Sequence, residues 1–534
     1  MQCGNLTLHM KQKILLLLTV LFMAFDLTAQ WHPGAVIDIN NIKTTLYGTG
    51  NFFRNRSNSS SAYNSHDVGY FVPAEGTAYT IFQNTLWIGA HDSNGLHLAA
   101  VRFNQGPDIN GGEDFWSGPL RVNDASTDIY TVMDYHHVWK VSRADIEALI
   151  ANPGGDIPED ILTWPAHGNV DDGFAANLAP FVDVDGDDIY NPRNGDYPDI
   201  LGDMALYCIY NDNFDYFNTG VVEHTETGGT PLGVEIHCML YGFNAPNDEK
   251  LNNTLFMRQW IYNRSANTYH DTYVGYWTEL DIGYCKDDYV GCNVNNGYFY
   301  GYNGAEIDGA GQIEAYGENP PAQLVMILGG PTMNPDGWDN PKYDSGGNQI
   351  VDESINGLGF GDGIIDNERL GMTGFVSYNF DYNPQTPIIN GEPKYAEDYY
   401  NYMRGMWKNG EPMQYGGSGV MGDTLGCVGP ACKFMYPYDS DPGNWGTGGI
   451  LPNGGFNQNG FYWSEETANN GQPTQPNDRR GLASSGPFTF PAGTCQIIDR
   501  AYVTCWFTNG FDRTVMDEWA VYIKNYFLNN LYNR

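Results

Sequence analysis

Basic residues are scarce in this chain of 534 residues, in which 26 Lys and Arg stand against 64 Asp and Glu and the formal net charge is −38. A polypeptide this acidic is repelled by phosphate backbones and by anionic bilayers. The composition therefore excludes nucleic-acid binding and electrostatic membrane docking as main functions. Cations and neutral polymers remain as partners.

Long apolar runs are also scarce, and the longest lies at the N-terminus. Lys11 and Lys13 precede the apolar segment 14–25, and the polar, small residues 26–30 follow it. A helix over that segment spans about 18 Å, too short for a hydrocarbon core of about 30 Å. We therefore expect a signal peptide over residues 1–29 and a secreted protein, extracellular or on the outer cell surface, with no membrane insertion after cleavage. An uncleaved membrane anchor is the alternative.

Motifs that identify common enzyme classes are missing. There is no GxSxG, no HExxH, no P-loop and no GxGxxG that opens a helix. His136 and His137 are adjacent, so in a strand their rings point to opposite faces and cannot chelate one ion. The carboxylate pair of a glycoside hydrolase is defined by a distance in space, which a sequence does not show. The sequence therefore names no catalytic residue.

Cysteines number nine, and removal of the signal peptide with Cys3 leaves an even number in an exported chain, which favours disulfides. We expect the pairs Cys285–Cys292 and Cys427–Cys432, because each closes a short loop that contains glycine. Zinc is the rival interpretation, but no CxxC pair and no His at ligand spacing accompany these cysteines. The connectivity of the others stays open.

Strands dominate the pattern along the chain. Segments rich in β-branched and aromatic residues are bounded by Gly, Asn, Asp and Pro, and we expect strands there: 79–89, 96–103, 234–243, 254–263, 272–277, 323–328 and 496–507. Only 142–150, with Ser142 as candidate N-cap, and 514–529 have a helical pattern. We therefore predict an all-β fold of packed antiparallel sheets, similar to a β-sandwich, with long calcium-binding loops and few short helices. A propeller is disfavoured because no repeat is visible.

Three stretches rich in Gly, Asn and Pro punctuate the chain, at 50–66, 330–365 and 440–480, and we expect loops there. They suggest a β-rich N-terminal domain, a central β domain opened by a calcium-type loop, a loop-rich insertion with a second such loop, and C-terminal strands with a helix. The predicted bounds are 30–175, 176–330, 331–480 and 481–534.

The sharpest chemical signal is the segment 183–196, DVDGDDIYNPRNGD, in which Asp183, Asp185 and Asp187 alternate around Gly186. A hard divalent cation needs several oxygens gathered around it, and crowded carboxylates repel one another without one. The pattern predicts a calcium loop related to DxDGDG loops rather than an EF-hand. A solvated Asx-rich turn is the alternative. We expect the remaining ligands to come from the Ile189 carbonyl, with its side chain packed inward, and from Asn191, Asn194 and Asp196.

A weaker candidate calcium loop lies at 352–368. Asp362, the apolar residue Ile364, Asp366 and Glu368 are typical of the closing half of such a loop. Other acidic clusters are interpreted as solvated turns in so acidic a chain: Asp281 with Asp287 and Asp288, and Asp439 with Asp441.

Several segments together resemble a family of large, mostly uncharacterised secreted proteins of Bacteroidota that typically carry a type IX secretion sorting domain. They include YTIFQNTLWIGA, WPAHGN, VDVDGDDIYNPRNGDYPDILGD, LNNTLFMRQWIYNRS, LDIGYCKDDYVGC and FGDGIIDNERLGM, and the resemblance covers about 70–525. It implies export, a surface or extracellular location and bound calcium, but no reaction. No C-terminal sorting domain follows the final helical stretch, so we expect a truncated chain or a different route of secretion or retention.

These observations favour an exported calcium-binding β protein that acts in cell-surface binding or adhesion, or as an extracellular structural component. Carbohydrate or a surface protein is the expected partner. A secreted hydrolase acting on polysaccharide or protein is the alternative, and a filament or shell subunit is a third possibility. A hydrolase requires a cleft with paired carboxylates or a triad, whereas a binding protein requires a grooved aromatic surface.

Overall fold

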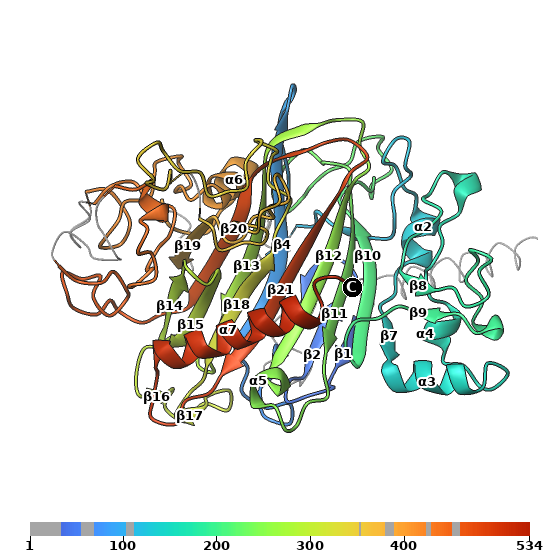
Figure 1. Ribbon diagram of the computed structural model, residues 1–534, viewed down its shortest axis with the longest axis horizontal. Coiled ribbons are helices and arrows are strands. Elements are labelled where there is room, and N and C mark those ends of the chain that lie inside the picture. The colour runs from blue at the N-terminus through green and yellow to red at the C-terminus, as the bar shows by residue number, and fades with distance from the viewer. Residues whose placement is uncertain are drawn as a thin grey trace, which may run out of the picture.

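The computed structural model describes residues 34–54, 69–102, 112–351, 354–379, 389–422, 429–450 and 460–534. Most of its strands belong to two large antiparallel sheets (Figure 1). The predicted signal peptide lies outside these ranges. Within them, every helix is too short or too polar to cross a membrane.

The eight-stranded sheet has the order β1-β2-β3-β4-β13-β20-β19, with β5 paired to β4. Its long central strands β4, β13 and β20 carry alternating side chains to its two faces. The strands are β1 (Gly34–Ile37), β2 (Thr44–Tyr47), β3 (Asn51–Phe52), β4 (Ile81–Asp92), β5 (Gly95–Ala99), β13 (Tyr269–Leu280), β19 (Gly374–Asn379) and β20 (Arg479–Phe490).

The nine-stranded sheet has the order β14-β15-β18-β21-β12-β11-β10-β6, with β7 paired to β10. Its strands are β6 (Trp116–Ser117), β7 (Trp139–Ser142), β10 (Met204–Asn211), β11 (Val234–Gly242), β12 (Thr254–Asn263), β14 (Asp288–Asn293), β15 (Tyr298–Asn303), β18 (Ala322–Gly329) and β21 (Cys495–Cys505). Two small hairpins complete the described strands: β8 (Phe181–Val182) with β9 (Tyr197–Pro198), and β16 (Ile307–Asp308) with β17 (Gly317–Glu318).

The two large sheets pack face to face. Leu86 and Tyr276 of the eight-stranded sheet share one buried core with Met257 and Val325 of the nine-stranded sheet. Burial of such side chains from water is the main stabilising contribution to a sandwich of this kind. The predicted architecture of packed antiparallel sheets with few helices is therefore confirmed.

Helices cover the two outer faces of the sandwich. Helix α7 (Arg513–Asn530) buries one apolar stripe against β18 and β21, and in Figure 1 it crosses the nine-stranded sheet. Helix α6 (Ala396–Met403) contacts β5, β13, β19 and β20 on the eight-stranded sheet. The remaining described α-helices are α2 (Ile129–Asp134), α3 (Arg143–Ala151), α4 (Glu159–Leu162) and α5 (Glu249–Asn252).

The two stretches with a helical pattern are present as α3 and α7, and the other described α-helices, α2, α4, α5 and α6, lie where the sequence shows no such pattern. Helices α2, α4 and α5 have six, four and four residues, too few to show a helical period. Helix α6 has the sequence AEDYYNYM, and Tyr and Asn are poor helix formers. Its Tyr399, Tyr402 and Met403 are buried, so packing on the sheet holds it in place.

The predicted domain boundaries do not fall between the sheets. The eight-stranded sheet contains strands from all four predicted segments: β1 to β5 from the first, β13 from the second, β19 from the third and most of β20 from the fourth. The nine-stranded sheet combines β6 and β7 with central strands and with the C-terminal β21. Described residues between β19 and β20 contribute α6, which packs on the eight-stranded sheet, and long loops, in which the Tyr436 carbonyl accepts from the Cys292 N–H of β14 in the nine-stranded sheet.

Candidate metal centre

The hairpin of β8 and β9 holds the loop 183–196 at its tip. One carboxylate oxygen from each of Asp183, Asp185 and Asp187 lies within 4.8 Å of the others. All three residues come from a single turn, and Asp185 and Asp187 are exposed. The convergence of the three predicted carboxylates therefore makes this loop a candidate cation site.

Backbone groups of the loop hold Asp183 in place. Its Oδ1 accepts a hydrogen bond from the Gly186 N–H at 2.7 Å, and its Oδ2 accepts one from the Asp188 N–H at 2.8 Å. The Asp188 N–H is the largest cause that lowers the pKa of Asp183 below its ordinary value. Gly186 has φ +76°, a conformation that glycine adopts without steric cost. The turn thus presents an ionised carboxylate.

The other predicted residues of this loop have different positions. Asp196 is buried, and its Oδ1 and Oδ2 accept the N–H groups of Val184 and Asn191, both at 2.8 Å. The Asn191 side chain accepts from the Arg193 N–H at 3.0 Å. The Ile189 side chain is 61% exposed, so the prediction that it packs inward is wrong. Asp196 therefore closes the base of the loop and lies outside the group of three.

The second predicted loop has a different arrangement. Asp366 accepts hydrogen bonds from the N–H groups of Asp336 and Gly337, and buried Glu368 accepts one from the Asn340 N–H. Asp362 accepts from the Ile364 N–H at 2.8 Å. Among the described residues, these carboxylates are not in a group of three that meets within 4.8 Å. A calcium ion at this loop stays a prediction.

The predicted disulfide between Cys285 and Cys292 is not formed, and both thiols are free. Cys292 lies on β14 in the core between the sheets, and its thiol donates to the Met435 carbonyl at 3.3 Å. Cys285 lies before that strand, in the turn after β13. Strand β14 therefore fixes the Cys292 thiol away from the turn. Cys432 is buried, and its predicted partner Cys427 lies outside the described residues.

An aromatic cavity of about 290 Å³ opens beside the hairpin of β8 and β9. Strand β12 contributes Trp260 and Tyr262, which are half-buried because they alternate with core residue Ile261. Phe181 of β8, directly before Val182 and Asp183, also lines the cavity. The lining residues are Asn177, Leu178, Ala179, Pro180, Phe181, Tyr207, His237, Trp260 and Tyr262.

A chain of polar contacts lies under this cavity. The Tyr207 hydroxyl is 2.8 Å from Nδ1 of His237, and Nε2 of His237 is 2.8 Å from Oε1 of Glu235. Arg264 donates to the same oxygen at 2.6 Å. Burial alone would raise the pKa of Glu235, but His237 and Arg264 lower it to about 2. His237 is therefore a buried histidine whose two ring nitrogens both have polar partners.

The acidic clusters interpreted as solvated turns are in part buried. Asp281 is 4% exposed, Asp288 is fully buried and Asp441 is 4% exposed. Asp441 accepts the N–H groups of Trp445 and Gly446, which explains its burial. Asp281 directly follows β13, a strand in the middle of the eight-stranded sheet. The sequence does not show this position, which is why the interpretation of Asp281 as part of a solvated turn is wrong.

Asp281 belongs to a second group of converging carboxylates that the sequence analysis missed. One oxygen each of Glu279, Asp281 and Asp478 lies within 4.8 Å of the others. Burial raises the pKa of Glu279 to about 7 and that of Asp281 well above its ordinary value. The only local indication of this group in the sequence is the pair of acids in TELDIG, which directly follows the predicted strand 272–277.

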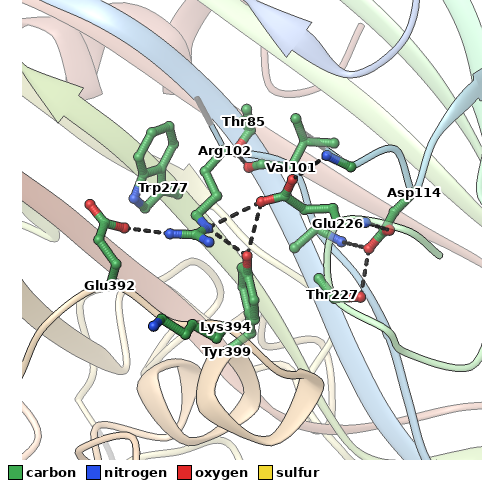
Figure 2. Close-up of polar contacts among 12 residues, drawn as sticks. Thr85, Val101, Arg102, Asp114, Glu226, Thr227, Trp277, Glu392, Lys394 and Tyr399 are labelled. Carbon is green, nitrogen blue, oxygen red and sulfur yellow. Dashed lines mark hydrogen bonds and ion pairs between the residues drawn. The ribbon is translucent and has the colours of Figure 1, made fainter. Parts of the chain in front are cut away.

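A buried ionic network around Arg102 (Figure 2) adjoins this second group through Arg480. Arg102 contacts Oε1 of Glu226 at 3.1 Å and Oε2 of Glu392 at 2.6 Å, and it also donates to the Tyr399 hydroxyl. Oε1 of Glu392 lies 3.0 Å from Nε of Arg480, which pairs in turn with Glu279. The network links α6 to the centre of the eight-stranded sheet.

Comparison with known proteins found no family model that matches this chain and no curated protein that matches it.

Proposed function

We propose that this is an exported, calcium-binding β protein that binds carbohydrate at a cell surface, with the aromatic cavity as its binding site. The loop 183–196 would hold the ion, and the sandwich would act as a rigid support. The observation that carries the proposal is the convergence of Asp183, Asp185 and Asp187 at the tip of the hairpin whose stem forms one wall of the cavity.

Calcium is the cation that this loop suits best. Its three converging donors are carboxylate oxygens, and the flexible coordination of Ca²⁺ accepts oxygens from an exposed loop. Mg²⁺ demands a stricter octahedral shell and gives up its water reluctantly. The Asn194 side-chain amide donates to Asp185 at 3.0 Å, so Asn194 lies beside the carboxylates that would hold the Ca²⁺.

Calcium would act on the cavity through the short hairpin. Phe181 pairs with Pro198, and the Asp199 N–H donates to the Pro180 carbonyl at 3.1 Å. A two-residue strand pair is weak by itself, so an ion at its tip would stabilise the wall that carries Phe181. Trp260 and Tyr262, which also line the cavity, are aromatic side chains of the kind that stack on sugar rings.

A calorimetric titration with Ca²⁺ and a melting curve with and without EDTA test the ion. We expect Asp183→Asn/Asp185→Asn/Asp187→Asn to lose the calcium bound at the loop, whereas the wild type gains about 2.7 kcal/mol from this site at a calcium concentration 100 times Kd. The control Asp134→Asn/Glu147→Gln/Glu518→Gln removes three exposed acids elsewhere and should bind calcium normally. Equal calcium binding by both triple variants would contradict the loop assignment.

A glycan array in the presence and absence of Ca²⁺ tests the ligand. We expect binding that weakens without calcium and is lost in Trp260→Ala. The control Trp338→Ala removes a 54% exposed indole that does not line the cavity and should bind normally. If the protein binds a surface protein but no glycan, that surface protein would replace carbohydrate as the ligand. If the protein hydrolyses a glycan and one carboxylate substitution abolishes the hydrolysis, the hydrolase alternative would be favoured.

A further inference from the structure

Carboxylates gather inside the molecule where β13 ends and β20 begins. Glu279 lies at the end of β13, Asp281 directly follows that strand, and Asp478 directly precedes β20. The ladder ends with Leu280 opposite Arg479, so one further step in the same register brings Asp281 opposite Asp478. We propose that Glu279, Asp281 and Asp478 form an interior site for a hard divalent cation, separate from the loop at 183–196.

Buried oxygens without a hydrogen-bond partner support this site. Glu279 and Asp281 are each 4% exposed, and Oε2 of Glu279 and Oδ1 of Asp281 lack a hydrogen-bond partner within the described structure. Arg480 pairs with Oε1 of Glu279 and with Oδ1 of Asp478. Buried polar oxygens are nearly always satisfied in folded proteins, and a cation between them would satisfy these two.

Charge around the cluster is unbalanced. The charges of Glu279, Asp281 and Asp478 act on one another, and Asp288 acts on Asp281, whereas the guanidiniums facing them are those of Arg480 and Arg54. Asp288 is fully buried and its Oδ1 also lacks a hydrogen-bond partner. With Glu392, which also acts on Glu279, the carboxylates outnumber the guanidiniums of Arg480, Arg54 and Arg479 that act on them, and a divalent cation would supply the missing charge.

The donor atoms favour a hard cation. All three converging donors are carboxylate oxygens, which suit Ca²⁺, Mg²⁺ and Mn²⁺. Cys285 lies in the turn between β13 and β14 but is not part of the converging group. Zinc, which prefers thiolate and imidazole, is therefore the poorer fit.

An ion at this position would join two parts of the fold. Glu279 and Asp281 belong to a central strand of the eight-stranded sheet, and Asp478 ends the long segment that begins after β19. Arg480 extends the junction to Glu392 and Arg102. The site would thus fasten the end of the segment between β19 and β20 to the centre of the eight-stranded sheet.

The experiment uses the full chain with the loop site removed by Asp183→Asn/Asp185→Asn/Asp187→Asn as the parent. The parent is stripped with chelator at neutral pH, exchanged into Ca²⁺, Mg²⁺ or Zn²⁺ separately, desalted, and assayed for retained metal and melting temperature. We expect one retained Ca²⁺ or Mg²⁺ per chain and a higher melting temperature. No retained ion and no shift, or retention of Zn²⁺ alone, would overturn the proposal.

The variant Asp281→Asn, made in this parent, tests whether Asp281 is a metal ligand or only a structural acid. We expect it to lose the retained ion and to melt in chelator at the same temperature as the parent or higher, because it removes repulsion among the carboxylates. If this variant fails to fold, Asp478→Asn, which is less buried, gives the same comparison. The control Asp441→Asn changes a buried acid whose oxygens both accept backbone N–H groups, and should lower the melting temperature without changing the ion count. An unchanged ion count in the Asp281 or Asp478 variant would overturn the proposal.

Discussion

Cys208 of β10 lies directly opposite Cys238 of β11, and both side chains are fully buried between the sheets. A hydrogen bond with the Cys238 thiol, together with burial, raises the pKa of Cys208 well above its ordinary value. Alkylating reagents attack the thiolate, which is disfavoured here, and burial also blocks access. The facing pair is therefore chemically inert in the folded protein.

We predict that Cys208 and Cys238 resist iodoacetamide in the native protein and react fully in denaturant without any reductant. Peptide mapping by mass spectrometry measures both states. Exposed Cys495 is the internal control and should react first. Native labelling of the pair, or a need for reductant after unfolding, would contradict the free-thiol arrangement.

Replacing Arg102 by methionine should destabilise the protein strongly. The substitution leaves Glu226 and Glu392 buried without the guanidinium that pairs with both. Loss of one partner from a buried ion pair costs about 3–5 kcal/mol. Urea unfolding of Arg102→Met measures the change. Arg121→Met is the control, because its partner Asp128 has a side chain that is 40% exposed and such pairs contribute about 1 kcal/mol or less. Similar losses in the two variants would show that the network is not stabilising.

Local periodicity accounts for what the sequence predicts well. The predicted strand 254–263 coincides with β12, and the predicted helix 514–529 lies within α7. The β-branched and aromatic residues of β12 and the apolar residues that recur with the helical period in α7 are local signals, so neighbouring residues suffice to identify both elements. The group of Asp183, Asp185 and Asp187 is predictable for the same reason, since one turn contains all three.

Contacts between distant segments could not be predicted. Asp478 meets Asp281 only because β13 and β20 pair in one particular register, and nothing near either residue specifies that pairing. Burial of Asp288 likewise depends on where β14 lies in its sheet. The interior cluster is thus a property of topology, whereas the loop cluster is a property of local sequence.

Ser142→Ala should lower the free energy of unfolding by about 1 kcal/mol. The Ser142 hydroxyl accepts a hydrogen bond from the Asp145 N–H at 3.1 Å and so caps α3, as predicted from the sequence. Urea unfolding at neutral pH measures the loss. Ser142→Thr keeps a capping oxygen and is the control, and an equal loss in both variants would argue against a capping contribution.

Stability should depend on acid pH through Glu235. Its folded pKa of about 2 lies below the ordinary value of 4.5, so the unfolded chain binds the proton more tightly. The resulting stabilisation, about 3 kcal/mol from the size of this shift, is fully present above pH 4.5 and is lost as pH falls towards 2. Glu235→Gln removes the titrating group. The difference in unfolding free energy between wild type and this variant should therefore shrink between about pH 5 and pH 3, because protonation progressively removes the wild-type advantage.

Urea unfolding at several pH values within this window measures that difference directly. Glu147→Gln on the exposed face of α3 is the control and should show no comparable pH dependence. A constant difference between wild type and Glu235→Gln across the window would mean that Glu235 does not change its proton affinity on folding. In that case the contacts with His237 and Arg264 would stabilise the fold through packing and geometry rather than through charge, since a charge interaction has to weaken as the carboxylate takes up a proton.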